Sequence, residues 1–138
     1  MGTEGLMNNP KRGKQLLRFD GFGLDHDRLE TVMATDIDAL IDVRNRILIV
    51  VESKLAGKEV PKGQQYALQR IVSDAKAAGK HGIAIVADHD VYDPDEDVFL
   101  KDLICREVYT TEREEWSVMK RRMTVRELAN WYVNRYFD

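Results

Sequence analysis

The sequence contains little cysteine and no long hydrophobic run. Cys105 is the only cysteine among 138 residues, so no internal disulfide can form and no zinc site with several cysteine ligands is available. Apolar runs such as residues 47–51 and 83–87 are far too short to span a bilayer, and residues 1–10 lack the apolar core of a signal peptide. We therefore expect a protein of a reducing, cytoplasmic compartment that has no membrane partner.

The sequence also lacks a strong excess of charge of either sign. Its formal net charge is -3, which argues against a protein that coats nucleic acid through bulk electrostatics. Basic residues cluster at 11–14 and 120–122, and acidic residues cluster at 88–97 and 112–115. Each run is either solvated surface or a local binding patch. Any contact with nucleic acid must therefore be local.

The composition is that of one folded domain, and the hydrophobic pattern predicts an α/β order within it. Hydrophobic residues make up 43% of the chain, and 138 residues are enough for a single domain with a real core. Apolar residues alternate along 37–43 and run together along 47–51, which predicts two strands joined by a short turn. Residues 64–78 carry apolar side chains at helical spacing, and residues 81–88 predict a buried strand parallel to the second one.

The C-terminal part predicts a second hairpin and a helix. Residues 103–109 and 115–120 have the pattern of two further strands. Thr124 and Glu127 have the spacing of a capping box, which predicts a helix that continues through Phe137. Four side chains are expected on one side of this helix: Leu128, Trp131, Tyr132 and Arg135. We divide the domain into a core, residues 35–88, and a C-terminal hairpin and helix, residues 103–138.

Charged side chains are expected to converge at the first hairpin. Side chains alternate across a strand, so Glu52 and Lys54 share a face, and Asp36 and Asp38 share a face. If the two strands pair about Asn45, Asp38 lies opposite Glu52 and Asp36 lies opposite Lys54. This register requires a turn with an odd number of residues, and we expect the three-residue turn 44–46 to have one residue in the left-handed region and a bulge. A two-residue turn would place the acids on opposite faces of the sheet.

Such a cluster predicts a site that binds a divalent cation and uses it to hydrolyse a phosphodiester. Crowded carboxylates raise one another's pKa values, and a hard cation relieves this repulsion. Mg²⁺ keeps several waters, so two carboxylates and a phosphate oxygen suffice to hold it. We expect Asp38 and Glu52 to bind the metal, and Lys54 to orient the attacking water and offset developing negative charge. The simpler interpretation is an exposed ion pair of little energetic value.

The segment from Asp38 through the apolar strand to Val50-Val51-Glu52-Ser53-Lys54 resembles the PD-(D/E)XK nuclease superfamily. The resemblance covers residues 35–88. It implies a restriction-endonuclease-like mixed central sheet flanked by helices. It also implies an endonuclease that uses Mg²⁺ or Mn²⁺ and acts on DNA, either as a monomer or as a homodimer. In that superfamily a helix after the lysine strand often brings a glutamine or a basic residue to the site, which adds Gln65, and Gln64 beside it, to the candidate residues.

The chain departs from the superfamily pattern in two places. The usual proline before the aspartate is absent, because the sequence reads Thr35-Asp36-Ile37-Asp38. This leaves Asp36 or Asp38 as the metal ligand, and we favour Asp38. The acid that many members carry on an earlier helix has no clear match, and Glu30 is the nearest candidate. The whole chain is also similar to small nuclease-like proteins of phages and prophages, which implies the host cytoplasm. The alternative is a nuclease fold that has lost catalysis and serves as a binding or assembly module.

Other candidates carry less weight. His81, His89 and the acidic residues 88–90 suggest a metal cluster, but the acidic loop is interpreted as solvated surface. The aromatic residues of the C-terminal hairpin and helix are interpreted as core rather than as platforms for bases. Cys105 has no obvious activating partner.

Overall fold

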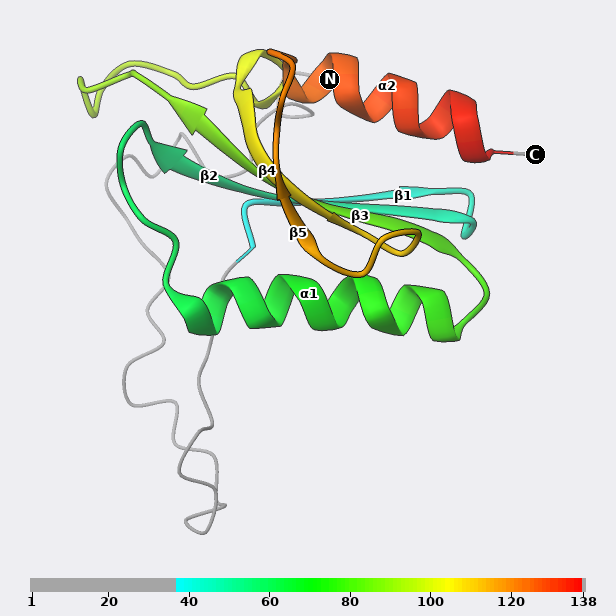
Figure 1. Cartoon of the computed structure of the whole chain (residues 1–138). Helices are drawn as coiled ribbons and strands as arrows, with labels where there is room; N and C mark the ends of the chain where they lie inside the picture. Colours follow the sequence, from blue (N-terminus) through cyan, green and yellow to red (C-terminus); the bar gives the residue numbers. More distant parts are fainter. Residues whose placement is uncertain (1–36, 138) are drawn as a thin grey trace, which may run out of the picture. The chain divides into compact units, whose positions relative to one another are not determined.

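A computed structural model describes residues 37–137 of the chain (Figure 1). The candidate residues Glu30 and Asp36 lie outside the described residues. The elements in chain order are β1 (Ala39–Val43), β2 (Ile47–Leu55), α1 (Lys62–Ala77), β3 (His81–His89), the short 3-10 helix η2 (Leu100–Asp102), β4 (Ile104–Thr110), β5 (Trp116–Val118) and α2 (Val125–Tyr136). The predicted α/β class is confirmed. None of the helices within residues 37–137 is long and apolar enough to cross a membrane.

The five strands form one mixed sheet in the order β1-β2-β3-β4-β5. Only β2 and β3 run parallel, and α1 connects them, as the sequence predicts. The other neighbouring pairs are antiparallel. Because β2 and β3 are parallel, their carboxyl ends meet at one edge of the sheet, where α1 begins (Figure 1).

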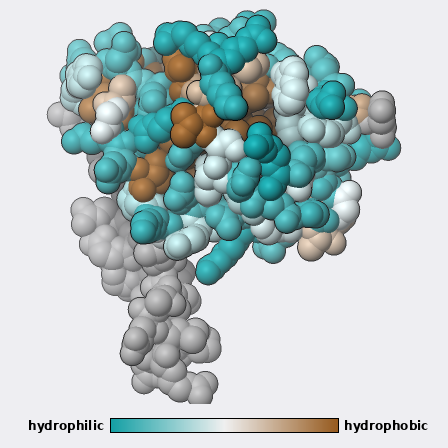
Figure 2. All heavy atoms as spheres, viewed as in Figure 1, coloured by the Kyte–Doolittle hydropathy of each residue, from teal (hydrophilic) through white to brown (hydrophobic). Residues whose placement is uncertain are grey.

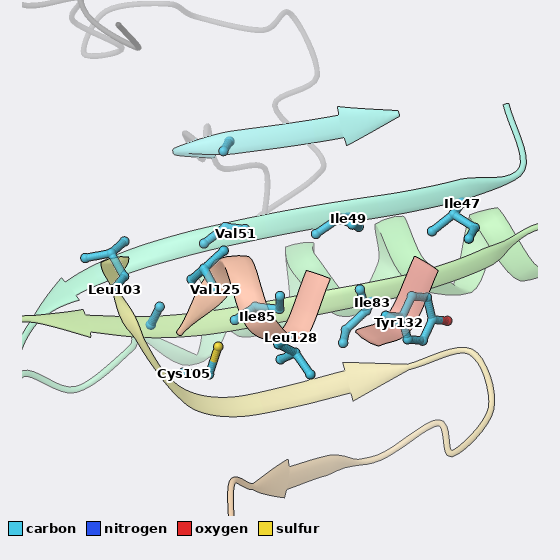
Figure 3. Packing of buried hydrophobic residues seen from close by; sticks show 12 residues of the cluster. Ile47, Ile49, Val51, Ile83, Ile85, Leu103, Cys105, Val125, Leu128 and Tyr132 are labelled. Carbon is cyan, nitrogen blue, oxygen red and sulfur yellow. The ribbon is translucent and has the colours of Figure 1, made fainter. Parts of the chain in front are cut away.

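The two helices cover opposite faces of the sheet (Figure 1), and each face has its own core. Along β2 the side chains alternate, so that Ile47, Ile49 and Val51 pack towards α2 while Leu48 and Val50 pack towards α1. Figure 3 shows the first three beside Leu128 and Tyr132 of α2. Burial of each such side chain stabilises the fold by about 1.5 to 3 kcal/mol relative to leaving it exposed. These two apolar layers fix the register of the central strands.

The first hairpin has the predicted register. Val43 pairs with Ile47 and Ala39 pairs with Val51, so the pairing is centred on Asn45. The turn has three residues, as expected. Two of them rather than one are left-handed, because both Arg44 and Asn45 have positive φ, 49° and 59°. No register shift interrupts the pairing of β1 with β2.

The two helices begin and end close to the predicted positions. Helix α1 follows Pro61, begins two residues earlier than expected and ends before Gly79, whose φ is 80°. The predicted capping box of α2 is confirmed: the Glu127 backbone N–H donates to the Thr124 hydroxyl (3.1 Å), and the Thr124 N–H donates to the Glu127 carboxylate (2.9 Å).

One aromatic residue of α2 does not belong to the core. Leu128 and Tyr132 are buried, but Trp131 is 51% exposed, so its assignment to the core is wrong. The buried stripe of α2 includes Val125 as well as Leu128 and Tyr132. At about 100° per residue, Trp131 lies on the flank of that stripe rather than within it. The expected grouping of four side chains placed the stripe too far round the helix.

Candidate functional site

The candidate site lies at the carboxyl end of β2, on the face of the sheet that α1 covers. Glu52 continues the side-chain alternation of Leu48 and Val50, and the residue is only 4% exposed. The Lys54 ammonium nitrogen Nζ lies 3.5 Å from the Glu52 oxygen Oε1. The Lys54 side chain is 23% exposed. The predicted pair of carboxylate and ammonium is therefore present, and it is not a pair of fully solvated surface charges.

Asp38 lies just beyond the paired part of β1, where the chain bends. Its oxygen Oδ2 accepts two hydrogen bonds from Ser53, one from the backbone N–H and one from the hydroxyl, both 2.7 Å. Ser53 follows Glu52 directly. The predicted register therefore brings Asp38 to the strand segment that carries Glu52. Its hydrogen bonds to the described residues, however, go to Ser53.

The first turn of α1 brings the two predicted glutamines to the same end of the sheet. Gln65 donates from Nε2 to the carboxylate oxygen Oε1 of Glu107, at 3.3 Å. The side-chain oxygen Oε1 of Gln64 is buried and has no hydrogen-bond partner among residues 37–137. The stripe of α1 that packs on the sheet is apolar at Leu68 and Val72 and becomes polar at its N-terminal end. It becomes polar where the sheet itself changes from apolar to charged.

Three further charged residues of this region were missed by the sequence analysis. Glu52 pairs in register with Val86 of β3, and Val86 pairs with Glu107 of β4, so the two glutamates share a face across three strands. Lys54 pairs in register with Asp88. The Asp88 carboxylate in turn accepts hydrogen bonds from the Arg106 guanidinium. Asp88 was interpreted as part of a solvated loop, although counting along two parallel strands in register places it beside Lys54.

A second polar cluster lies at the opposite end of the sheet, at the start of β3. The Glu112 carboxylate accepts hydrogen bonds from the hydroxyls of Tyr132 and Thr111, both 2.6 Å, and lies 2.6 Å from Nδ1 of His81. Burial alone would raise the pKa of Glu112, but these bonds together hold its pKa below the ordinary value. The same Tyr132 hydroxyl oxygen lies 2.9 Å from the backbone oxygen of Gly82, so its single hydrogen is shared between the two acceptors. We interpret this cluster as structural because it ties α2 to the sheet.

The lone thiol takes no part in either cluster. Cys105 lies in β4 and is 4% exposed, within the core under α2. Burial, and to a lesser extent the negative charge of Glu127, raises the pKa of Cys105 to about 12. A thiol with this pKa is protonated and unreactive at neutral pH.

Within residues 37–137, no group of three or more histidine, cysteine, aspartate or glutamate side chains is arranged to hold a metal ion. A metal at this site would therefore depend on two carboxylates together with water and substrate oxygens, an arrangement that Mg²⁺ commonly uses. Comparisons with family models, with curated proteins and with solved structures return no match.

Proposed function

We propose that this chain is a Mg²⁺-dependent endonuclease of the PD-(D/E)XK type that hydrolyses phosphodiester bonds in DNA. The observation that carries the proposal is the nearly buried Glu52 carboxylate, 3.5 Å from Lys54 at the end of an apolar strand. Taking a carboxylate out of water costs several kcal/mol. Glu52 is buried beside a lysine, at the edge of the sheet where an enzyme of this type would bind its substrate. This burial therefore favours a catalytic role for Glu52 over that of an ordinary surface ion pair.

The residues present fit a hard divalent cation. Glu52 and Asp38 supply the oxygen donors that Mg²⁺ and Mn²⁺ prefer. One oxygen of Asp38 is held by Ser53, and its other oxygen, Oδ1, makes no hydrogen bond to a described residue. Hydrogen bonds of this kind orient metal-binding carboxylates in proteins. Glu52 and Asp38 are therefore the residues that would hold the ion.

Each side chain has a separate task in this proposal. When bound, the cation would lower the pKa of a water molecule and offset negative charge on the phosphate. Lys54 would orient the attacking water and stabilise the charge that develops on the phosphate oxygens. Gln65 would hold Glu107 at the border of the site. The mixed sheet with a helix on each face supports the restriction-endonuclease-like arrangement that the superfamily resemblance implies.

A second candidate is a binding or assembly module that has this fold without catalysis. It is favoured by the lack of a group of three metal ligands in the described part of the chain. The two candidates differ in one property. The nuclease cleaves DNA when a divalent cation is added, whereas the module binds its partner and leaves DNA intact.

The deciding experiment is a cleavage assay with the full chain on single-stranded, duplex and branched DNA, with Mg²⁺, with Mn²⁺ and with chelator. We expect metal-dependent cleavage that is lost in Lys54→Ala. The matched control is Lys58→Ala, because Lys58 is an exposed lysine in the loop after the same strand. It should cleave like the wild type. A wild-type chain that cleaves none of the substrates would exclude the nuclease and leave the module.

A further inference from the structure

An irregularity in the sheet points to a residue that the superfamily resemblance does not include. The pairing of β3 with β4 shifts by one residue between the pairs Val86–Glu107 and Ala87–Cys105, so Arg106 is an extra residue in β4. Cys105 packs under α2, whereas Glu107 bonds to Gln65 of α1 on the other face. Bulges of this kind redirect side chains and are frequent beside active sites.

The bulge allows the Arg106 side chain to bond across to β3. Its Nε donates to Oδ1 of Asp88 at 2.9 Å, and its Nη2 donates to the same oxygen. Asp88 is the register partner of Lys54. Arg106 is therefore held on the strand next to Asp88, in the same part of the sheet as the proposed catalytic pair. The side chains of Arg106 and Asp88 remain 24% and 26% exposed.

The ion pair fixes one edge of the guanidinium and leaves another edge for a ligand. Asp88 engages the edge formed by Nε and Nη2. The group has five N–H donors in a rigid plane, so the edge formed by Nη1 and Nη2 remains available for a second planar or tetrahedral anion. Because the plane is already held, little rotational freedom is lost when such an anion binds. Phosphate oxygens match this geometry in a bidentate fashion.

We propose that Arg106 is a phosphate-binding residue of the site. Asp88 positions the guanidinium, and Arg106 holds the nucleic-acid backbone beside the scissile bond. The proposal rests on the proposed nuclease function and adds to it how an acidic site binds an anionic substrate. Glu52, Asp88 and Glu107 give this end of the sheet three carboxylates. The Arg106 guanidinium, held against Asp88, offsets part of the repulsion between these carboxylates and the approaching nucleic-acid backbone.

The test measures how many phosphate charges the bound protein neutralises. DNA binding to the full chain is followed by fluorescence anisotropy, in chelator so that no cleavage occurs, from about 50 to about 200 mM KCl. Each lost phosphate contact reduces the slope of log K against log salt by about 0.9 for duplex DNA and about 0.7 for a single strand. We expect this reduction in Arg106→Gln. Arg106→Lys should restore the slope but bind more weakly, because it keeps the charge and loses the fork.

The control is Arg113→Gln, which removes another ion-paired arginine, one that is 66% exposed in the β4–β5 turn and bonded to Glu115. Its slope should equal that of the wild type. If thermal unfolding shows that Arg106→Gln is not folded, Arg106→Met, which keeps the alkyl stem, takes its place.

An unchanged slope in the Arg106 variant, or a wild-type chain that does not bind DNA, overturns the assignment of Arg106. The cleavage assay is read separately. If the wild type cleaves DNA and Arg106→Gln has the wild-type slope, the role of Arg106 is refuted and the nuclease function stands. A reduced slope in a chain that never cleaves refutes the nuclease and leaves a phosphate-binding module.

Discussion

Replacing Glu52 by glutamine removes one charge with almost no change in volume, so its effect on folding reports the electrostatics of the site. At 3.5 Å from Lys54 and an effective dielectric constant of about 20, the ion pair gains about 5 kcal/mol. The substitution recovers the cost of burying the carboxylate, several kcal/mol, and the ammonium of Lys54 is left without a large penalty because its side chain is 23% exposed to water. The two terms nearly cancel. We therefore expect the metal-free variant to be as stable as the wild type, or more stable, within about 1 kcal/mol.

The same substitution should remove the stabilisation that a bound metal provides. A ligand that binds only the folded state raises the free energy of unfolding by RT ln(1 + [L]/Kd), about 1.4 kcal/mol at about ten times Kd. By the scaling for domains of about 100 residues, this raises Tm by roughly 6 to 11 °C. Glu52→Gln removes one of the two proposed carboxylate ligands, so its Tm should hardly change with Mg²⁺, and its cleavage of DNA should be abolished.

The assay is thermal unfolding of the wild type, Glu52→Gln and Glu96→Gln, each with chelator and with a series of Mg²⁺ concentrations. Glu96 is an exposed acid in the loop after β3 and serves as the control for a general effect of charge. It should keep the shift in Tm that the wild type shows. A variant at Glu52 that keeps the full Mg²⁺ shift, or one that loses much stability and retains cleavage, would refute the metal site and make Glu52 a structural residue.

Three further predictions concern the framework. Thr124→Ala should lower the free energy of unfolding by about 1 kcal/mol, because it removes half of the capping box of α2; urea unfolding measures this, and an unchanged midpoint would contradict it. Arg44→Gly should raise stability by up to about 1 kcal/mol, since a left-handed non-glycine residue costs about 1 to 2 kcal/mol and the freer unfolded chain offsets part of the gain; a loss of stability would count against the turn described. The pKa of Glu112 is lowered on folding, so its contribution is fully present above its ordinary pKa of 4.5 and is lost as pH falls through the folded value. Glu112→Gln should flatten the dependence of Tm on pH below about 4.5, and a variant with the wild-type profile would show that the carboxylate does not matter.

Much of the first hairpin could be predicted because side-chain direction in paired strands depends only on the parity of the register. An odd turn centred on Asn45 is the register that places the charged residues of the two strands on a common face, and the structure has that turn. The pair Glu52 and Lys54 followed from alternation along a strand whose first five residues, 47–51, are all apolar. The packing of α1 against the sheet followed from its apolar stripe, and the polar residue Gln65 lies at the N-terminal end of that stripe.

The remaining features depend on long-range geometry that a local pattern does not carry. The bond from Ser53 to Asp38 arises because the chain bends immediately before β1, so the alternation that should govern Asp38 no longer applies. Arg106 is the extra residue of a bulge in β4, and a bulge breaks the two-residue alternation from which side-chain direction is predicted. The position of Asp88 beside Lys54 could have been predicted from the parallel strands, but the run of acids after it resembles an ordinary solvated loop.

The two polar clusters occupy opposite ends of β3, and this separation makes the chain a suitable starting point for engineering. From His81 to Asp88 the strand spans about 23 Å at roughly 3.3 Å per residue. Substitutions that far apart combine additively in most proteins. The anchoring bonds of Glu112 and Tyr132 can therefore be strengthened to raise thermal tolerance while the chemistry around Glu52 is left alone. Under the proposed nuclease function, a Glu52→Gln variant on the same scaffold would be a reagent that holds DNA without cutting it.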